Sequence, residues 1–208
     1  MKKLATILLT LVLGITLLVP GQASAATTYT VKPGDTLWKI SKRYQVGLSE
    51  IINANPQFSN PDLIYPGDRV TIPYSRSRSQ SKDFGQQVMD LTNQQRAKYG
   101  LSPLKWDWQL ARVARYKSAD MRDKGYFSHQ SPTYGSPFQM MKNFNINYRS
   151  AGENIAAGQR TPQEVVNAWM NSKGHRENIL KSGYTHIGVG YVKGGSYGHY
   201  WTQMFISK

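Results

Sequence analysis

A stretch without any aliphatic residue divides this chain of 208 residues. Between Tyr74 and Lys82 the sequence alternates serine with arginine and ends in glutamine, serine and lysine. Such a segment has no apolar surface to bury, and its like charges repel one another. We therefore predict a flexible linker at 74–82, between a small domain at 27–73 and a larger one at 83–208.

The N-terminal residues 1–25 have the three-part pattern of a secretory signal peptide. Lys2 and Lys3 precede an uncharged apolar run over 4–19, and Ala23-Ser24-Ala25 supplies small residues for cleavage. The alternative is a membrane anchor, but at ~1.5 Å per residue the run reaches about 24 Å, short of a ~30 Å hydrocarbon core. We expect cleavage after Ala25, secretion, and no membrane span in the mature chain.

The chain has a formal charge of +14 and no cysteine. The absence of cysteine excludes a disulfide scaffold, Cys-ligated zinc, an iron–sulfur cluster and thiol catalysis. The positive charge, which lies mainly beyond residue 73, predicts anionic partners. Because an exported protein does not meet the chromosome, we expect anionic wall polymers rather than nucleic acid.

The small domain is predicted to fold in the order β-α-α-β. A strand at 29–31 precedes a helix capped by Asp35, and a second helix capped by Ser49 precedes a strand at 69–72. Three blocks in this region, at 29–40, 53–56 and 63–68, resemble a LysM domain.

LysM domains bind glycans that contain N-acetylglucosamine, chiefly peptidoglycan and chitin. The resemblance implies a groove between two loops, formed by Gly34, Asp35, Thr36 and Leu37 and by Asp62, Leu63, Ile64 and Tyr65. The alternative is that Pro33-Gly34-Asp35 and Pro66-Gly67-Asp68 are simply turns.

The larger domain begins with helical periodicity and ends with strand periodicity, which predicts an α+β fold. We expect a helix over 108–124, helices opened by Ser136-Pro137 and by Thr161-Pro162, and a hairpin of strands 186–193 and 197–207 around Gly194-Gly195. The basic residues of the first helix are predicted to lie mostly on a solvated face: Arg112, Arg115, Lys117, Arg122 and Lys124.

Seven blocks of this domain resemble the CAP superfamily, which contains cysteine-rich secretory proteins, antigen 5 and plant pathogenesis-related proteins. The blocks lie at 93–96, 104–107, 127–129, 151–155, 169–172, 174–180 and 200–203. The resemblance implies an α-β-α sandwich with a cleft over its sheet. A signal peptide, LysM and CAP domain together resemble secreted envelope proteins of Gram-positive bacteria, including a spore-associated group.

Three of these blocks contain His129, Glu153 and His175, and the resemblance implies that the fold brings these residues together in the cleft. Two imidazoles and a carboxylate could bind a divalent ion such as zinc, or Glu153 could orient an imidazole that acts as a general base. The animal and plant pattern has a second Glu and a second His, where this chain has Ser172 and Tyr200, with His199 beside the latter. The alternative is a purely structural polar network.

These residues predict a wall- or spore-associated protein that binds peptidoglycan and presents its CAP domain in a binding or scaffold role. The alternative is a hydrolase of wall or protein substrates that uses His129 and Glu153. Whether the protein is an enzyme is left open, because the sequence shows no complete catalytic set. Lipid carriage, which the family implies weakly, has no clear support among the residues.

Overall fold

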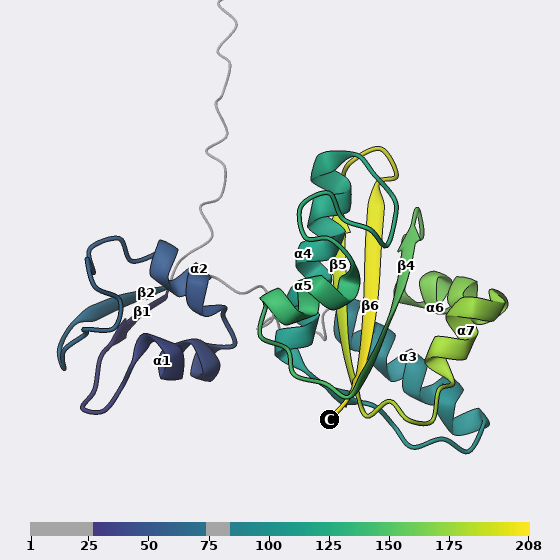
Figure 1. Ribbon diagram of the computed structural model, residues 1–208, viewed down its shortest axis with the longest axis horizontal. Coiled ribbons are helices and arrows are strands. Elements are labelled where there is room, and N and C mark those ends of the chain that lie inside the picture. The colour runs from purple at the N-terminus through teal and green to yellow at the C-terminus, as the bar shows by residue number, and fades with distance from the viewer. Residues whose placement is uncertain (1–26, 74–83) are drawn as a thin grey trace, which may run out of the picture.

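The computed structural model describes residues 27–73 and 84–208 (Figure 1). The predicted signal peptide (1–25) and the whole predicted linker (74–82) lie outside the described residues. The small domain contains one antiparallel pair of strands and two short helices, in the predicted order. These elements are β1 (Thr27–Thr30), α1 (Leu37–Tyr44), α2 (Leu48–Asn53) and β2 (Arg69–Ile72).

Both helices of the small domain begin at a different residue from the one predicted. Thr36, not Asp35, caps α1 by accepting a hydrogen bond from the Lys39 amide. Gly47, not Ser49, occupies the N-cap of α2 and supplies no capping side chain. The domain closes over an apolar core of its own, which consists of Val31, Leu37, Ile40, Val46, Ile51, Val70 and Ile72.

The larger domain is a four-stranded sheet between two layers of helices (Figure 1). The strand order is β3-β5-β6-β4, in which β3 is parallel to β5 and the other pairs are antiparallel. The strands are β3 (Lys105–Trp106), β4 (Ser150–Ala157), β5 (His186–Lys193) and β6 (His199–Ser207). The helices are α3 (Phe84–Lys98), α4 (Trp108–Lys124), α5 (Pro137–Asn143), α6 (Pro162–Asn171) and α7 (Lys173–Ile179).

Strand β6 carries the core of both layers because its side chains alternate between two buried faces. Trp201 and Phe205 pack with residues of α3 and α6, whereas Met204 and Ile206 pack with residues of α4 and α5. The result is the predicted α+β architecture, with α4 and α5 on one face and α3 and α6 on the other (Figure 1).

Helix α4 lies unusually close to the sheet. A Cβ atom on Gly188 would be 2.2 Å from the Ala111 amide nitrogen, and one on Gly190 would be 2.2 Å from the Ala114 carbonyl carbon. Two glycines of β5 therefore allow the helix backbone to rest directly on the strand. Within the described ranges, no helix is long and apolar enough to cross a membrane.

Candidate functional site

The buried Lys117 of α4 holds the loop that carries His129 in place. The Lys117 ammonium donates to the carbonyl oxygens of Ser128 (2.7 Å) and His129 (3.0 Å) and to the Tyr126 hydroxyl (3.1 Å). Burial lowers the pKa of Lys117, whereas the nearby Glu153 and Asp120 carboxylates act in the opposite direction. The prediction that Lys117 lies on a solvated face is therefore wrong: its side chain is 1 % exposed.

Asp120, one turn further along α4, holds the other end of the same loop. Its carboxylate accepts hydrogen bonds from the hydroxyls of Tyr126, Ser131 and Thr133. Burial acts to raise the pKa of Asp120, but these hydrogen bonds outweigh it and keep the pKa below its usual range. The loop at 126–133 is thus attached to the helix at both ends of the segment that presents His129.

Glu153 of β4 meets the imidazole of His129, as the sequence suggested. His129 Nδ1 and Glu153 Oε1 are 2.7 Å apart, and the side chains are 52 % and 1 % exposed, respectively. The second carboxylate oxygen, Oε2, is buried and has no hydrogen-bond partner among the described residues. A buried carboxylate that contacts one ring nitrogen of a half-exposed imidazole fixes the orientation of the ring.

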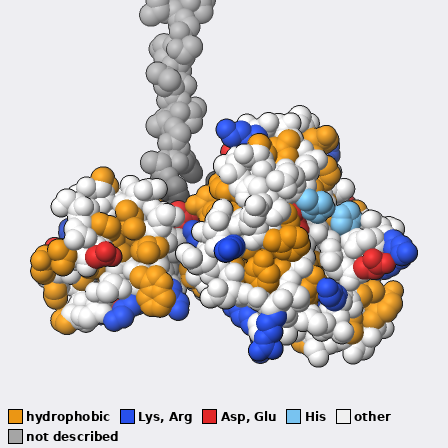
Figure 2. All heavy atoms as spheres, viewed as in Figure 1, with side chains coloured by type: hydrophobic (Ala, Val, Ile, Leu, Met, Phe, Trp, Pro, Cys, Tyr) orange, Lys and Arg blue, Asp and Glu red, His pale blue; other side chains and the backbone are white. Residues whose placement is uncertain are grey.

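His175 of α7 lines the same pocket, which has a volume of about 1070 Å³. His129 lines the pocket as well, and burial, together with the electrostatic influence of His129, lowers the pKa of His175. Figure 2 shows histidine side chains exposed on one face of the larger domain. The pocket can therefore present one imidazole paired with a carboxylate and a second that tends to stay neutral.

Among the residues that the structure describes, no three His, Cys, Asp or Glu side chains come together in a way that could hold a metal ion. Ser172 lines the pocket, whereas Tyr200 is fully buried against Met121 and Ile155. His199 contacts the Tyr191 hydroxyl at 2.8 Å. A zinc site at these residues stays a prediction.

Several other residues of the family-like blocks hold elements together. Asn154 donates to the His175 carbonyl (3.1 Å) and to Gln203 Oε1 (3.0 Å), and it accepts from Asn178 (2.9 Å). Arg96 is completely buried and donates to the backbone carbonyls of Ser102, Ile179 and Lys181. The structural network that the sequence left open as an alternative therefore exists beside the pocket.

Exposed aromatic side chains on the pocket wall were not singled out from the sequence. Phe127 and Phe138 line the pocket and are 44 % and 50 % exposed. The exposed Tyr197 packs against Phe127, with ring centroids 5.9 Å apart. From the sequence alone, aromatic residues are predicted to be buried. No pattern in the sequence marks these rings as exposed, and only the contacts of the folded chain show it.

The two predicted glycan-binding loops lie at the same end of the small domain. Thr30 pairs with Arg69, so the chain leaves β1 and enters β2 side by side, and the Val31 amide donates to the Asp68 carbonyl at 2.9 Å. In the first loop Gly34 is exposed with φ of 79°. Asp35 accepts from the Tyr29 hydroxyl (2.6 Å) and pairs with Arg43 (3.1 Å), while Leu37 is buried in the core.

The second loop presents apolar side chains to solvent. Leu63 and Tyr65 are 55 % and 64 % exposed, Asp62 is also exposed, and Ile64 packs partly against the core. Trp38 of α1, which the sequence did not assign to the groove, is 53 % exposed under the Lys42 ammonium. Figure 2 shows that hydrophobic side chains gather on the face of the small domain turned to the viewer.

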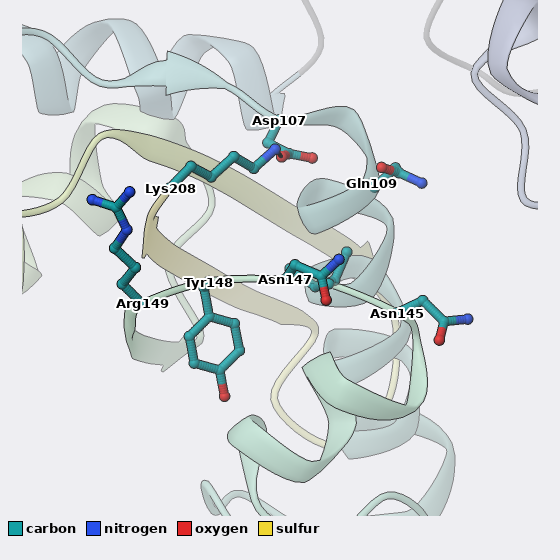
Figure 3. Close-up of a pocket in the computed structure, with 8 residues that line it drawn as sticks. Asp107, Gln109, Asn145, Asn147, Tyr148, Arg149 and Lys208 are labelled. Atoms are coloured by element: carbon teal, nitrogen blue, oxygen red, sulfur yellow. Dashed lines mark hydrogen bonds and ion pairs between the residues drawn. The ribbon is translucent and has the colours of Figure 1, made fainter.

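A second depression of about 520 Å³ lies on the larger domain, apart from the histidine pocket (Figure 3). Its lining includes the ion pair of Asp107 and Lys208, whose charged atoms are 2.7 Å apart. Figure 3 shows that Arg149, Tyr148 and Asn145 point in different directions around it. These polar groups do not converge on one point, so the depression does not have the arrangement of a chemical site.

Comparisons with known proteins match both domains. The sequence model of the LysM domain family matches residues 29–73. The chain is 62 % identical over 125 residues to the uncharacterized protein YkwD of Bacillus subtilis, covering 60 % of this chain and 48 % of YkwD. It is 49 % identical over 45 residues to the spore coat assembly protein ExsA of Bacillus cereus, covering 22 % of this chain and 7 % of ExsA. The chain thus spans less than half the length of both relatives.

A solved structure supports the fold of the larger domain. A crystal structure of an extracellular protein containing a SCP domain from Bacillus anthracis superposes with a TM-score of 0.56 at 38 % identity, covering 69 % of this chain and 47 % of that one. The model of the cysteine-rich secretory protein family, CAP, matches residues 89–205, more than half of the chain. The chain therefore belongs to the cysteine-rich secretory protein (CAP) family and carries a LysM domain before its CAP domain.

Proposed function

We propose that this protein is secreted, binds the N-acetylglucosamine-containing glycan of peptidoglycan through its LysM domain, and presents the CAP pocket at the envelope in a binding or scaffold role. The observation that carries the proposal is the pair of exposed side chains Leu63 and Tyr65 beside the exposed turn at Gly34. Apolar and aromatic side chains can cover the faces of a sugar, while backbone groups of the two loops pair with its N-acetyl group.

The proposed place of binding rests on a relative of the LysM domain. The match to the spore coat assembly protein ExsA supports a spore envelope as one location of the LysM domain. Anionic wall polymers are a further proposed partner because of the positive charge of the chain. Lys and Arg side chains are spread over the visible face of the CAP domain rather than merged into one patch (Figure 2), so this attraction would be diffuse and weakened by salt.

We expect the double substitution Leu63→Ala and Tyr65→Ala to weaken binding to purified peptidoglycan about tenfold. Losing ~1.4 kcal/mol of apolar contact corresponds to that factor, and the two side chains can provide it. Co-sedimentation with purified walls measures the change. Tyr99→Ala is the matched control, since Tyr99 is an equally exposed aromatic residue (58 %) of the CAP domain. Equal binding of the double variant and the control would refute the proposed groove.

Hydrolysis is the second candidate function, and the 2.7 Å contact between His129 Nδ1 and the buried Glu153 carboxylate is the observation that favours it. An imidazole held by a carboxylate can accept a proton from water. However, among the described residues no hydroxyl that lines the pocket is hydrogen-bonded to His129 or His175, so a serine nucleophile with its base is not formed.

We therefore expect the wild-type protein to release no more product from peptidoglycan or casein than Glu153→Gln does. The substitution keeps the shape of the side chain but removes its charge, so any catalysis through the His129 imidazole would fall sharply. Release of reducing ends, amino groups and peptides measures the three reaction types. Turnover by the wild type that Glu153→Gln lacks would replace the binding role with the hydrolytic one.

A further inference from the structure

Glu50 of the LysM helix α2 reaches the CAP domain. The Tyr116 hydroxyl of α4 donates a hydrogen bond to Glu50 Oε1, and Arg112 Nη1 lies 3.5 Å from Glu50 Oε2. The side chains of Arg112 and Glu50 are only 15 % and 22 % exposed. A carboxylate of one domain is thus enclosed by a cation and a hydroxyl of the other.

The receiving surface on the CAP domain is built from three packed side chains. Arg112 lies over the rings of Phe144 (5.2 Å) and Tyr116 (5.9 Å), and the two rings pack against each other with centroids 5.3 Å apart. Two effects raise the pKa of Tyr116 to about 12: burial, which is the larger, and the hydrogen bond to Glu50. Stacking between aromatic rings holds the guanidinium in place before the carboxylate arrives, which reduces the entropy lost on contact.

Gly47 gives this contact a signature in the sequence. Its φ of −66° and ψ of 146° suit any residue, and an N-cap favours serine, threonine or aspartate. A Cβ atom at this position would nevertheless be 2.0 Å from Glu50 Oε2 and 2.1 Å from Arg112 Nη1. The backbone does not require glycine here, but a side chain would displace the ends of Glu50 and Arg112, which are the two groups that form the contact.

We propose that α2 of the LysM domain and α4 of the CAP domain form a docked pair through Glu50, Arg112 and Tyr116. The contact is small, but a short segment joins the two domains, so their encounter is intramolecular and a weak contact suffices. Docking leaves Leu63 and Tyr65 exposed. If the LysM domain binds glycan as proposed above, the bound glycan therefore meets the CAP domain in one fixed orientation.

The test measures domain tumbling by ¹⁵N relaxation on residues 27–208, without any glycan. In the wild type, amides of both domains should report one common rotational correlation time. Gly47→Ala and Glu50→Lys should each lower the value of the LysM domain roughly twofold relative to the CAP domain, since a released domain tumbles according to its own size. The matched control is Gly183→Ala, at a position where a Cβ meets no atom within 4 Å.

A charge reversal completes the test. Glu50→Lys combined with Arg112→Glu should bring the two correlation times closer together than in Glu50→Lys alone, because the ion pair is rebuilt with its signs exchanged even though the stacking of Arg112 on the two rings is lost. Independent tumbling of the two domains in the wild type would overturn the docked pair, as would a common correlation time retained in both single variants. Because no glycan is present, neither result depends on whether the LysM groove binds peptidoglycan.

Discussion

Gly190→Ala is expected to destabilise the CAP domain by about 3 kcal/mol, the upper end of what overpacking a core usually costs. The added methyl group would meet the Ala114 carbonyl carbon and the Arg115 amide nitrogen at 2.2 Å. These atoms belong to the backbone of α4 and cannot rotate away as the end of a side chain can. The helix must therefore lift from β5, and the contacts of Leu110, Val113 and Ala114 with the sheet loosen.

Urea unfolding followed by circular dichroism measures this loss as a lower midpoint. Gly183→Ala provides the control, since that glycine lies in open space and the substitution should leave the midpoint within the error of the method. A Gly190→Ala protein with the wild-type midpoint would show that α4 does not rest on the strand backbone as described.

Lys117→Met is expected to cost about 3 kcal/mol and to release the loop that presents His129. The methionine fills a similar volume but leaves the carbonyl oxygens of Ser128 and His129 without their donor, and unpaired buried polar groups cost about 1–3 kcal/mol each. The positive charge that faces Glu153 and Asp120 is lost as well. Stability and the geometry of the pocket should therefore change together.

Urea unfolding gives the stability, and the NMR signals of the His129 ring report its contact with Glu153. We expect those signals to shift and broaden in Lys117→Met and to stay in place in Lys124→Met, a control at an exposed lysine of the same helix. Unchanged His129 signals in Lys117→Met would mean that the loop is held without the buried ammonium.

The bounds of helices and strands were predicted best where residues close together in the chain determine them. Gly125 adopts φ of 68° and ends α4 where predicted, and Ser136 forms a capping box with Gln139 at the start of α5. Strand β5 has the predicted bounds, 186–193, and β6 begins two residues later than predicted. In each case the residues that decide the boundary are neighbours in the chain, so pattern and structure agree.

Strand β4 had no such signal, because its residues are buried by partners far away in the chain. Glu153 and Asn154 lie in its middle, and polar residues there do not suggest a strand that is buried on both faces. Their partners are His129, Asn178 and Gln203, which only the folded sheet brings together. Lys117 was misjudged for the same reason: a lysine on an amphipathic helix reads as solvated until its carbonyl acceptors are known.

The position of β6 sets a condition on how the CAP domain can form. It follows all other elements of the domain in the sequence, yet it lies between β4 and β5 and pairs with both along its length. A growing chain that lacks β6 has β4 and β5 without the strand that joins them. The domain can therefore complete its sheet only after its last strand has been synthesised, so the central place in the sheet is filled at the end of synthesis.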